Sequence, residues 1–155
     1  MNILRKAKDD VDALVDAYLD ASLLKIKDYK EHVSLRGKNI EVANVEQASY
    51  LAYYDEIRVD LKSLLAYYEV KVRESKAAAW KLINDNSQID HSDREKDILI
   101  NNNISYQKVN RIYLEIKEMH DTLDSICEQF RNRAFTLNNI VKIRTAALED
   151  ITLYE

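Results

Sequence analysis

One uninterrupted amphipathic stretch decides the fold: VNRIYLEIKEMHDTLDSICEQFRNRAFTLNNIV, residues 109–141. Its apolar residues recur at alternating steps of three and four, the spacing that gives an α-helix one buried face. No proline or glycine interrupts it, so nothing in the stretch favours the end of a helix. The side chains on and beside this apolar stripe are Val109, Ile112, Ile116, Met119, Leu123, Ile126, Phe130, Phe135, Leu137 and Val141.

The rest of the chain repeats the helical pattern. Its 155 residues contain no proline and one glycine, with 46% apolar and 32% charged residues, which is the composition of amphipathic helices rather than of sheets or disordered tails. We therefore predict a single all-α domain over residues 1–155. Its long amphipathic helices cover about residues 3–36, 42–83 and 93–150, with a polar break at 84–92.

Local signals mark where these helices begin and end. Gly37 can adopt the left-handed conformation that commonly closes a helix, and it follows the first predicted helix. Ser92 and Glu95 have the spacing of a capping box, in which each side chain accepts a hydrogen bond from the other's backbone. These residues predict the start of the third helix.

The predicted third helix is long for a chain of this size. At ~1.5 Å per residue it would span roughly 80–90 Å, which outruns the core that the other two helices could build. We therefore expect a helical bundle or coiled-coil-like homo-oligomer, in which the ten stripe residues named above contact other copies.

Charge and cysteine content limit the classes of function. The net charge of −4 gives the whole molecule no attraction to nucleic acid or anionic lipid. Cys127 is the only cysteine, so an internal disulfide is excluded and a reducing cytoplasm is favoured. No signal peptide and no run of ~20 apolar residues is visible. We expect a soluble cytoplasmic protein with no membrane partner.

The residues that commonly carry catalysis do not converge. The three histidines are far apart: His32, His91 and His120. Four carboxylates recur at three-residue steps: Glu115, Glu118, Asp121 and Asp124. Each step turns about −60° around a helix, so these groups wind across its surface instead of meeting at a metal. We expect no enzyme, cofactor or metal site; a magnesium-dependent nucleotide hydrolase built on these carboxylates is the last-ranked alternative.

The helix over residues 42–83 has a face suited to single-stranded nucleic acid. Its members lie within about 60° of one another: Arg58, Lys62, Arg73, Lys76 and Trp80. Lys71 and Lys81 lie close by in sequence, and Glu69 is the one acid well inside the face. Cations can follow phosphates while the indole stacks on bases, although a solvated charged face is an equal alternative.

A second basic group lies near the C-terminus, where no acid occurs between Glu128 and Glu149. Its cations are Arg131, Arg133, Lys142 and Arg144. They flank the apolar stripe, so they could contact phosphates or fix the pairing between helices, and both alternatives stay open.

Two short motifs resemble the UvsY-type recombination mediators of large tailed phages. One is the run FRNRAFTLNN, residues 130–139, after a long amphipathic helix; the other is Lys71-Val72-Arg73 in an aromatic-rich helix. The family usually has glycine where this chain has Ala134, which is where a bend would be expected. The resemblance implies a small, all-helical, ring-forming protein of DNA recombination and repair, acting in the host cytoplasm.

The resemblance also implies partners and residue roles. Such mediators bind single-stranded DNA and help a RecA-like recombinase replace the single-strand-binding protein. By position, DNA binding falls on Lys71, Arg73 and Lys76, and assembly falls on the helix through Phe135. We thus expect a recombination mediator; the alternative is a structural or adaptor helical bundle that binds only other proteins.

Overall fold

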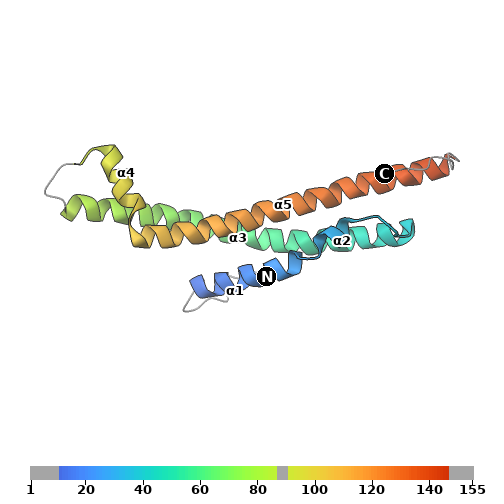
Figure 1. Ribbon diagram of the computed structural model, residues 1–155, viewed down its shortest axis with the longest axis horizontal. Helices are drawn as coiled ribbons and strands as arrows, with labels where there is room; N and C mark the ends of the chain where they lie inside the picture. The colour runs from blue at the N-terminus through green and yellow to red at the C-terminus, as the bar shows by residue number, and fades with distance from the viewer. Residues whose placement is uncertain (1–10, 87–90, 147–155) are drawn as a thin grey trace.

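The computed structural model describes residues 11–86 and 91–146, and all regular structure in these ranges is α-helical. The helices are α1 (Val11–Ile26), α2 (Tyr29–Val33), α3 (Ile40–Asn86), α4 (Asp93–Asn101) and α5 (Ile104–Thr145). Figure 1 shows α3 and α5 side by side and running in opposite directions, with α4 at the turn between them. The helix α1 lies alongside the middle of this hairpin. The predicted all-α class is confirmed.

The first predicted helix is not continuous. Within the described part of residues 3–36, α1 ends at Ile26 and α2 covers only Tyr29–Val33. The turn between them brings His32 of α2 against α3, where its ring stacks on Tyr50 with centroids 4.3 Å apart. Its Nδ1 also lies 2.7 Å from the Tyr54 hydroxyl. These contacts with a distant helix favour the break over the local helical pattern.

Gly37 adopts the predicted left-handed conformation, with φ of 70°. It does not close a helix directly, because α2 has already ended at Val33. Instead it lies inside a turn in which the Lys38 N–H donates to the Leu35 carbonyl at 3.2 Å. Such a turn needs a residue that tolerates positive φ at its third position, and glycine meets that need without strain.

The third predicted helix starts as expected and then divides. Ser92 and Glu95 form the predicted capping box ahead of α4. The continuous helix predicted over residues 93–150 is wrong, because α4 ends at Asn101 and α5 starts at Ile104. The Asn103 Oδ1 accepts a hydrogen bond from the Tyr106 N–H at 3.0 Å and caps α5. Asparagine side chains compete in this way with helix continuation.

The core lies between α3 and α5 and is completed by α1. Its fully buried aromatic centre is formed by Tyr54 and Tyr68 of α3 and Phe130 of α5. The Tyr54 ring stacks on that of Phe130 with centroids 5.3 Å apart. Val15 and Leu19 of α1 pack into the same cluster. The core therefore joins α1, α3 and α5, and residues of α2 pack against it.

The apolar stripe of α5 is covered within one chain, contrary to the argument that it needs other copies. Seven of the ten residues predicted to face another copy are buried here: Ile112, Ile116, Met119, Leu123, Ile126, Phe130 and Leu137. The physical reason is the match in length between α3, with 47 residues, and α5, with 42. Val109 is half-buried, and only Phe135 and Val141 are exposed.

A polar network joins the start of α1 to both long helices. The Tyr68 hydroxyl donates to Asp12 Oδ1 at 2.6 Å, and Lys108 Nζ lies 3.4 Å from Asp12 Oδ2. The hydrogen bond from Tyr68 is the main cause that lowers the pKa of Asp12, with Lys108 and Lys71 adding to it. Burial is the main cause that raises the pKa of the Tyr68 hydroxyl, and the hydrogen bond to Asp12 adds to it.

Replacing Tyr68 by phenylalanine removes this hydrogen bond and should lower the free energy of unfolding by about 1–2 kcal/mol at pH 7. A carboxylate whose pKa is lower in the folded than in the unfolded protein stabilises the fold at pH values above its unfolded pKa of about 3.9. This stabilisation is lost as the pH falls through the pKa of the folded state. The difference between variant and parent should therefore shrink below about pH 4.

Urea unfolding at pH 7 and pH 3 measures this effect. Tyr67→Phe is the matched control, because it removes a neighbouring hydroxyl and keeps the Tyr68–Asp12 bond. A Tyr68→Phe difference that is the same at both pH values would contradict the assignment to Asp12.

Candidate nucleic-acid interface

The distal half of α3 presents an aromatic ring among exposed cations. We call Lys62, Arg73, Lys76 and Trp80 the basic face of α3; their spacing places them on one side of the helix. The Trp80 residue is 50% exposed, whereas the adjacent Ala79 is buried and faces the core. The face is therefore turned away from the buried core. It lies on the part of α3 that runs toward α4, as Figure 1 shows for the helices.

Two cations of the basic face already have acidic neighbours. Arg73 Nη2 lies 2.7 Å from Glu69 Oε1, and Lys76 Nζ lies 3.5 Å from Asp97 Oδ1 on α4. All four side chains are more than half exposed. Exposed ion pairs contribute only about 0–1 kcal/mol each, so a phosphate can replace either carboxylate at small cost.

Arg58 does not join this face as predicted. Its side chain is largely buried and bridges Asp55, at 2.6 Å, and Asp124 of α5, at 3.1 Å. The hydrogen bond to Asp55 is the main cause that raises the pKa of Arg58, and Asp124 adds to it. Because two carboxylates surround its guanidinium, Arg58 links α3 to α5 and is not available to bind a phosphate.

Lys71 and Lys81 also lie away from the basic face. Two residues along a helix turn by about 200°, so Lys71 points away from Arg73. The Lys71 Nζ lies over the rings of Tyr67 and Tyr68, 5.1 and 5.6 Å from their centroids. Lys81 is exposed on a neighbouring side of α3, about 100° around the helix from Trp80. Of the Lys-x-Arg motif, only Arg73 belongs to the candidate surface.

The predicted C-terminal basic group is divided by the fold. Arg133 is only 4% exposed, and its Nη1 donates to the Ala43 carbonyl at 3.0 Å and to Gln47 Oε1. Burial lowers the pKa of this guanidinium. The prediction that Arg133 contacts DNA is therefore wrong, because the side chain fills the contact between α5 and the start of α3.

The other three members stay on the surface. Arg131 forms an exposed ion pair with Glu128 at 3.0 Å, and Lys142 and Arg144 lie in the last turn of α5. Because α3 and α5 are antiparallel, these cations lie at the opposite end of the molecule from Trp80 (Figure 1). The structure does not combine the two basic groups into one site.

The groups weighed for catalysis do not form a metal site or a reactive nucleophile in the described part of the chain. Among residues 11–86 and 91–146, no cluster of histidine, cysteine, aspartate and glutamate could hold a metal ion. Glu115 pairs with Arg111 at 3.3 Å. Cys127 is fully buried, and burial raises the pKa of its thiol, which disfavours the reactive thiolate.

One surface feature was not predicted from the sequence. A groove between α1 and α5 has acidic residues along its edges and apolar residues at its base. The signal available was the apolar pattern of residues 19–26, where Leu19, Leu23, Leu24 and Ile26 occupy more than one face of the helix. A helix that packs only at one face leaves some of these residues exposed.

Comparison with protein-family models, curated proteins and solved structures finds no match to this chain. Within the described ranges, none of the helices combines the length and the apolar character that crossing a membrane requires.

Arg133 should matter for stability and not for DNA binding. Arg133→Ala leaves the Ala43 carbonyl and Gln47 without their donor and opens a cavity, so it should cost about 2–4 kcal/mol. Arg133→Met fills more of the space and should cost about 1–2 kcal/mol. Urea unfolding measures both, and oligonucleotide affinity of the folded Met variant should equal that of the parent.

Lys142→Met is the matched control, because Lys142 is exposed in the last turn of α5. It should leave the free energy of unfolding unchanged. An Arg133→Met variant that is as stable as the parent but binds oligonucleotide more weakly would return Arg133 to the DNA-binding surface.

Proposed function

We propose that this protein binds single-stranded DNA through the basic face of α3 and acts as a recombination mediator. In this role it helps a RecA-like recombinase replace the single-strand-binding protein on the strand. The observation that carries the DNA-binding part is the half-exposed Trp80 on the same face as Arg73 and Lys76. The mediator part rests on the resemblance to UvsY-type proteins.

The physical chemistry of the face suits single strands rather than a duplex. An exposed indole offers a stacking surface to an unpaired base, which is worth about 1–3 kcal/mol per base. A duplex keeps its bases stacked on one another and gains nothing from this ring. The cations on the same side of α3 can follow the phosphates that flank the stacked base.

The charge distribution favours local and reversible binding. The chain as a whole carries −4, so the long-range field does not attract nucleic acid. Affinity must come from short-range contacts at Lys62, Arg73, Lys76 and Trp80. A loading protein benefits from weak, exchangeable contacts, since the strand must pass on to the recombinase, and several copies together can supply the total affinity.

The motifs of the resemblance support the proposal in part. Arg73, one member of the Lys-x-Arg motif, lies on the basic face with Lys76. The helix α5 continues through Ala134, where UvsY-type proteins usually have glycine. The assembly role implied for Phe135 is compatible with its exposed position.

An adaptor that binds only other proteins is the second candidate. Its supporting observation is a set of exposed apolar side chains on α4 and at the adjoining ends of α3 and α5: Leu82, Ile98, Leu99 and Ile104. A partner protein could bury these side chains together with Trp80. Salt dependence separates the candidates, because displacing counterions from phosphates gives a steep loss of affinity with salt.

Reversing two cations of the basic face should weaken DNA binding. Arg73→Glu with Lys76→Glu should reduce the affinity for an oligo(dT) strand at least ~10-fold at low salt and lower the logarithmic salt slope by about 1.4, for two lost phosphate contacts. Fluorescence anisotropy of labelled oligonucleotide measures both. Trp80 is the only tryptophan, so quenching of its emission reports stacking directly.

Lys30→Glu with Arg36→Glu is the matched control, because both cations are exposed and lie near α2. This control changes the net charge equally and should keep most of the affinity. Equal losses in the two variants would mean that only net charge matters, and an unquenched Trp80 would remove the stacking role.

Mediator activity has its own test. The protein should raise the strand-dependent ATPase rate of its cognate recombinase when the DNA carries the cognate single-strand-binding protein, and should have little effect on bare DNA. The Arg73→Glu/Lys76→Glu variant should lose this stimulation, because it no longer holds the strand. Tight DNA binding without stimulation on coated strands would leave a DNA-binding helical bundle and reject the mediator role.

A further inference from the structure

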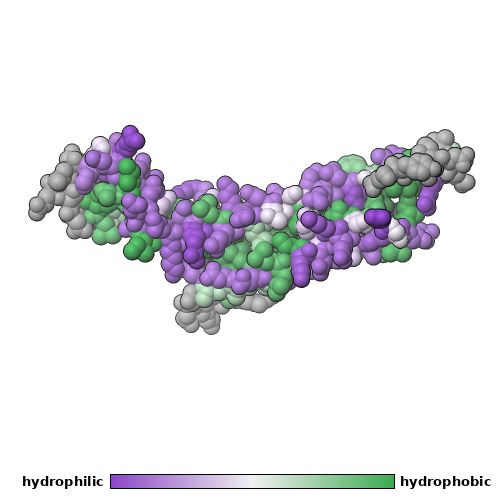
Figure 2. Space-filling model, viewed as in Figure 1, coloured by the Kyte–Doolittle hydropathy of each residue, from purple (hydrophilic) through white to green (hydrophobic). Residues whose placement is uncertain are grey.

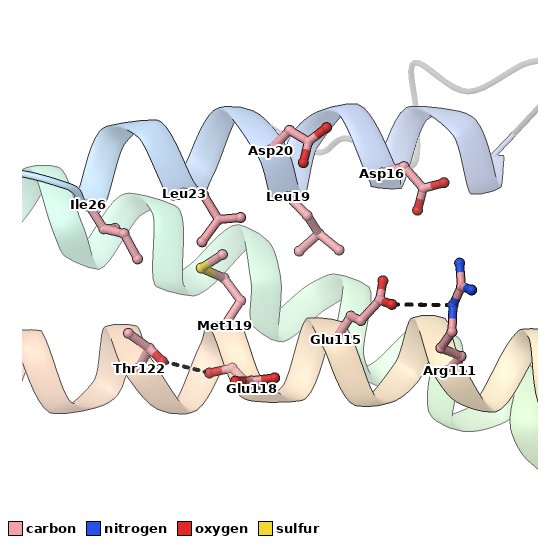
Figure 3. A pocket seen from close by; sticks show the side chains of 10 residues that line it. All are labelled: Asp16, Leu19, Asp20, Leu23, Ile26, Arg111, Glu115, Glu118, Met119 and Thr122. Atoms are coloured by element: carbon pink, nitrogen blue, oxygen red, sulfur yellow. Dashed lines mark hydrogen bonds and ion pairs between the residues drawn. The ribbon is translucent and has the colours of Figure 1, made fainter.

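The groove between α1 and α5 is a concave feature that the proposed function does not use. It has a volume of about 550 Å³. Leu19 and Leu23 of α1 point toward Met119 of α5 across it, as Figure 3 shows. Leu19 and Met119 form a nearly buried base, whereas Leu23 is 54% exposed. The groove thus has an apolar interior that is open to solvent.

Acidic side chains line both edges of this groove. Asp16 and Asp20 lie on the α1 edge, and Glu115 and Glu118 lie on the α5 edge. Arg111 is the one cation among the lining residues and pairs with Glu115. Four carboxylates and one guanidinium leave a net charge of −3, so an occupant needs an apolar group flanked by cations.

The C-terminal end of α5 has this combination on its outer face. Phe135 is 68% exposed, the highest exposure of any aromatic residue in the described ranges. At 100° per residue, Arg131, Phe135 and Lys142 lie within about 40° of one another. The ion pair between Arg131 and Glu128 is exposed to solvent. No acidic residue lies between Glu128 and Glu149.

We propose that the α1–α5 groove binds the outer face of the C-terminal end of α5 from a second copy of this chain. Phe135 enters between Leu19, Leu23 and Met119, where a thioether and a ring make favourable contact. Arg131 and Lys142 then lie against the carboxylates of the two edges. The inner face of the same helix segment stays on α3, because Arg133 and Leu137 remain buried in their own chain.

This contact joins two different surfaces, so it is heterologous. Each copy has one groove and one C-terminal end, and successive copies therefore form a closed ring or an open filament. The helix α1, which forms one side of the groove, lies beside the middle of the hairpin, and the donor segment of α5 lies at the end opposite α4 (Figure 1). Neither surface includes the basic face of α3, so assembly leaves that face open and does not depend on DNA binding.

Charge reversal on each side of the contact tests the proposal. The groove variant carries Asp20→Lys and Glu118→Lys; the helix variant carries Arg131→Glu and Lys142→Glu. Each variant alone brings like charges together at the contact and should sediment as a monomer of 18.1 kDa. In an equal mixture, the basic groove of one variant can bind the acidic helix face of the other, and the acidic groove of the second can bind the basic helix face of the first. Assembly should therefore return toward the parental mass.

Sedimentation velocity without DNA gives the readout and keeps this test separate from the proposed function. Phe135→Gln is a second test variant. Because Phe135 is exposed, this change should leave the fold of the single chain intact and should dissociate the assembly. The Lys30→Glu/Arg36→Glu control should keep the parental mass. Helicity by circular dichroism should be unchanged in all variants.

Three results would overturn the proposal. The first is a parent chain that stays at 18.1 kDa at every concentration tested. The second is a pair of charge variants that assemble as the parent does, and the third is a mixture that stays monomeric. A monomeric parent that binds a separate basic amphipathic peptide through Asp20 and Glu118 would assign the groove to a different protein.

Discussion

The pairing of two apolar stripes, one on α3 and one on α5, is the constraint on which the rest of the molecule depends. A helix of 47 residues and one of 42 can cover each other along much of their length, and the short connection through α4 makes them run in opposite directions. Figure 2 shows the apolar residues along the middle of the molecule among polar neighbours. Once this seam is buried, the outer faces of both helices are free to carry charge.

Charged residues at the edge of the seam serve the fold rather than a ligand. Arg58 and Arg133 both extend from one long helix to the other, and each replaces water by carboxylate or carbonyl oxygens of the opposite segment. Cations farther from the seam, such as Arg73 and Lys76, meet only exposed carboxylates. Distance from the seam therefore separates structural cations from those that remain available for binding.

The small net charge conceals an uneven distribution of charge along the molecule. Cations accompany Trp80 near one end of the hairpin, carboxylates line the groove beside its middle, and cations return at the far end of α5. Such an arrangement allows two kinds of contact at once. Opposite charges on different parts of the chain can bring copies together, while a separate basic face remains open to a nucleic acid strand.

The sequence alone determined the properties that depend on neighbouring residues. Helical periodicity predicted the all-α class and α3, and Ser92 with Glu95 predicted the start of α4. Only the tertiary structure decided which side chains face a second helix. The α1–α2 break follows from His32 meeting Tyr50, and the burial of Arg133 follows from its place opposite Ala43. Periodicity describes the face of one helix, whereas these outcomes depend on the segment that covers that face.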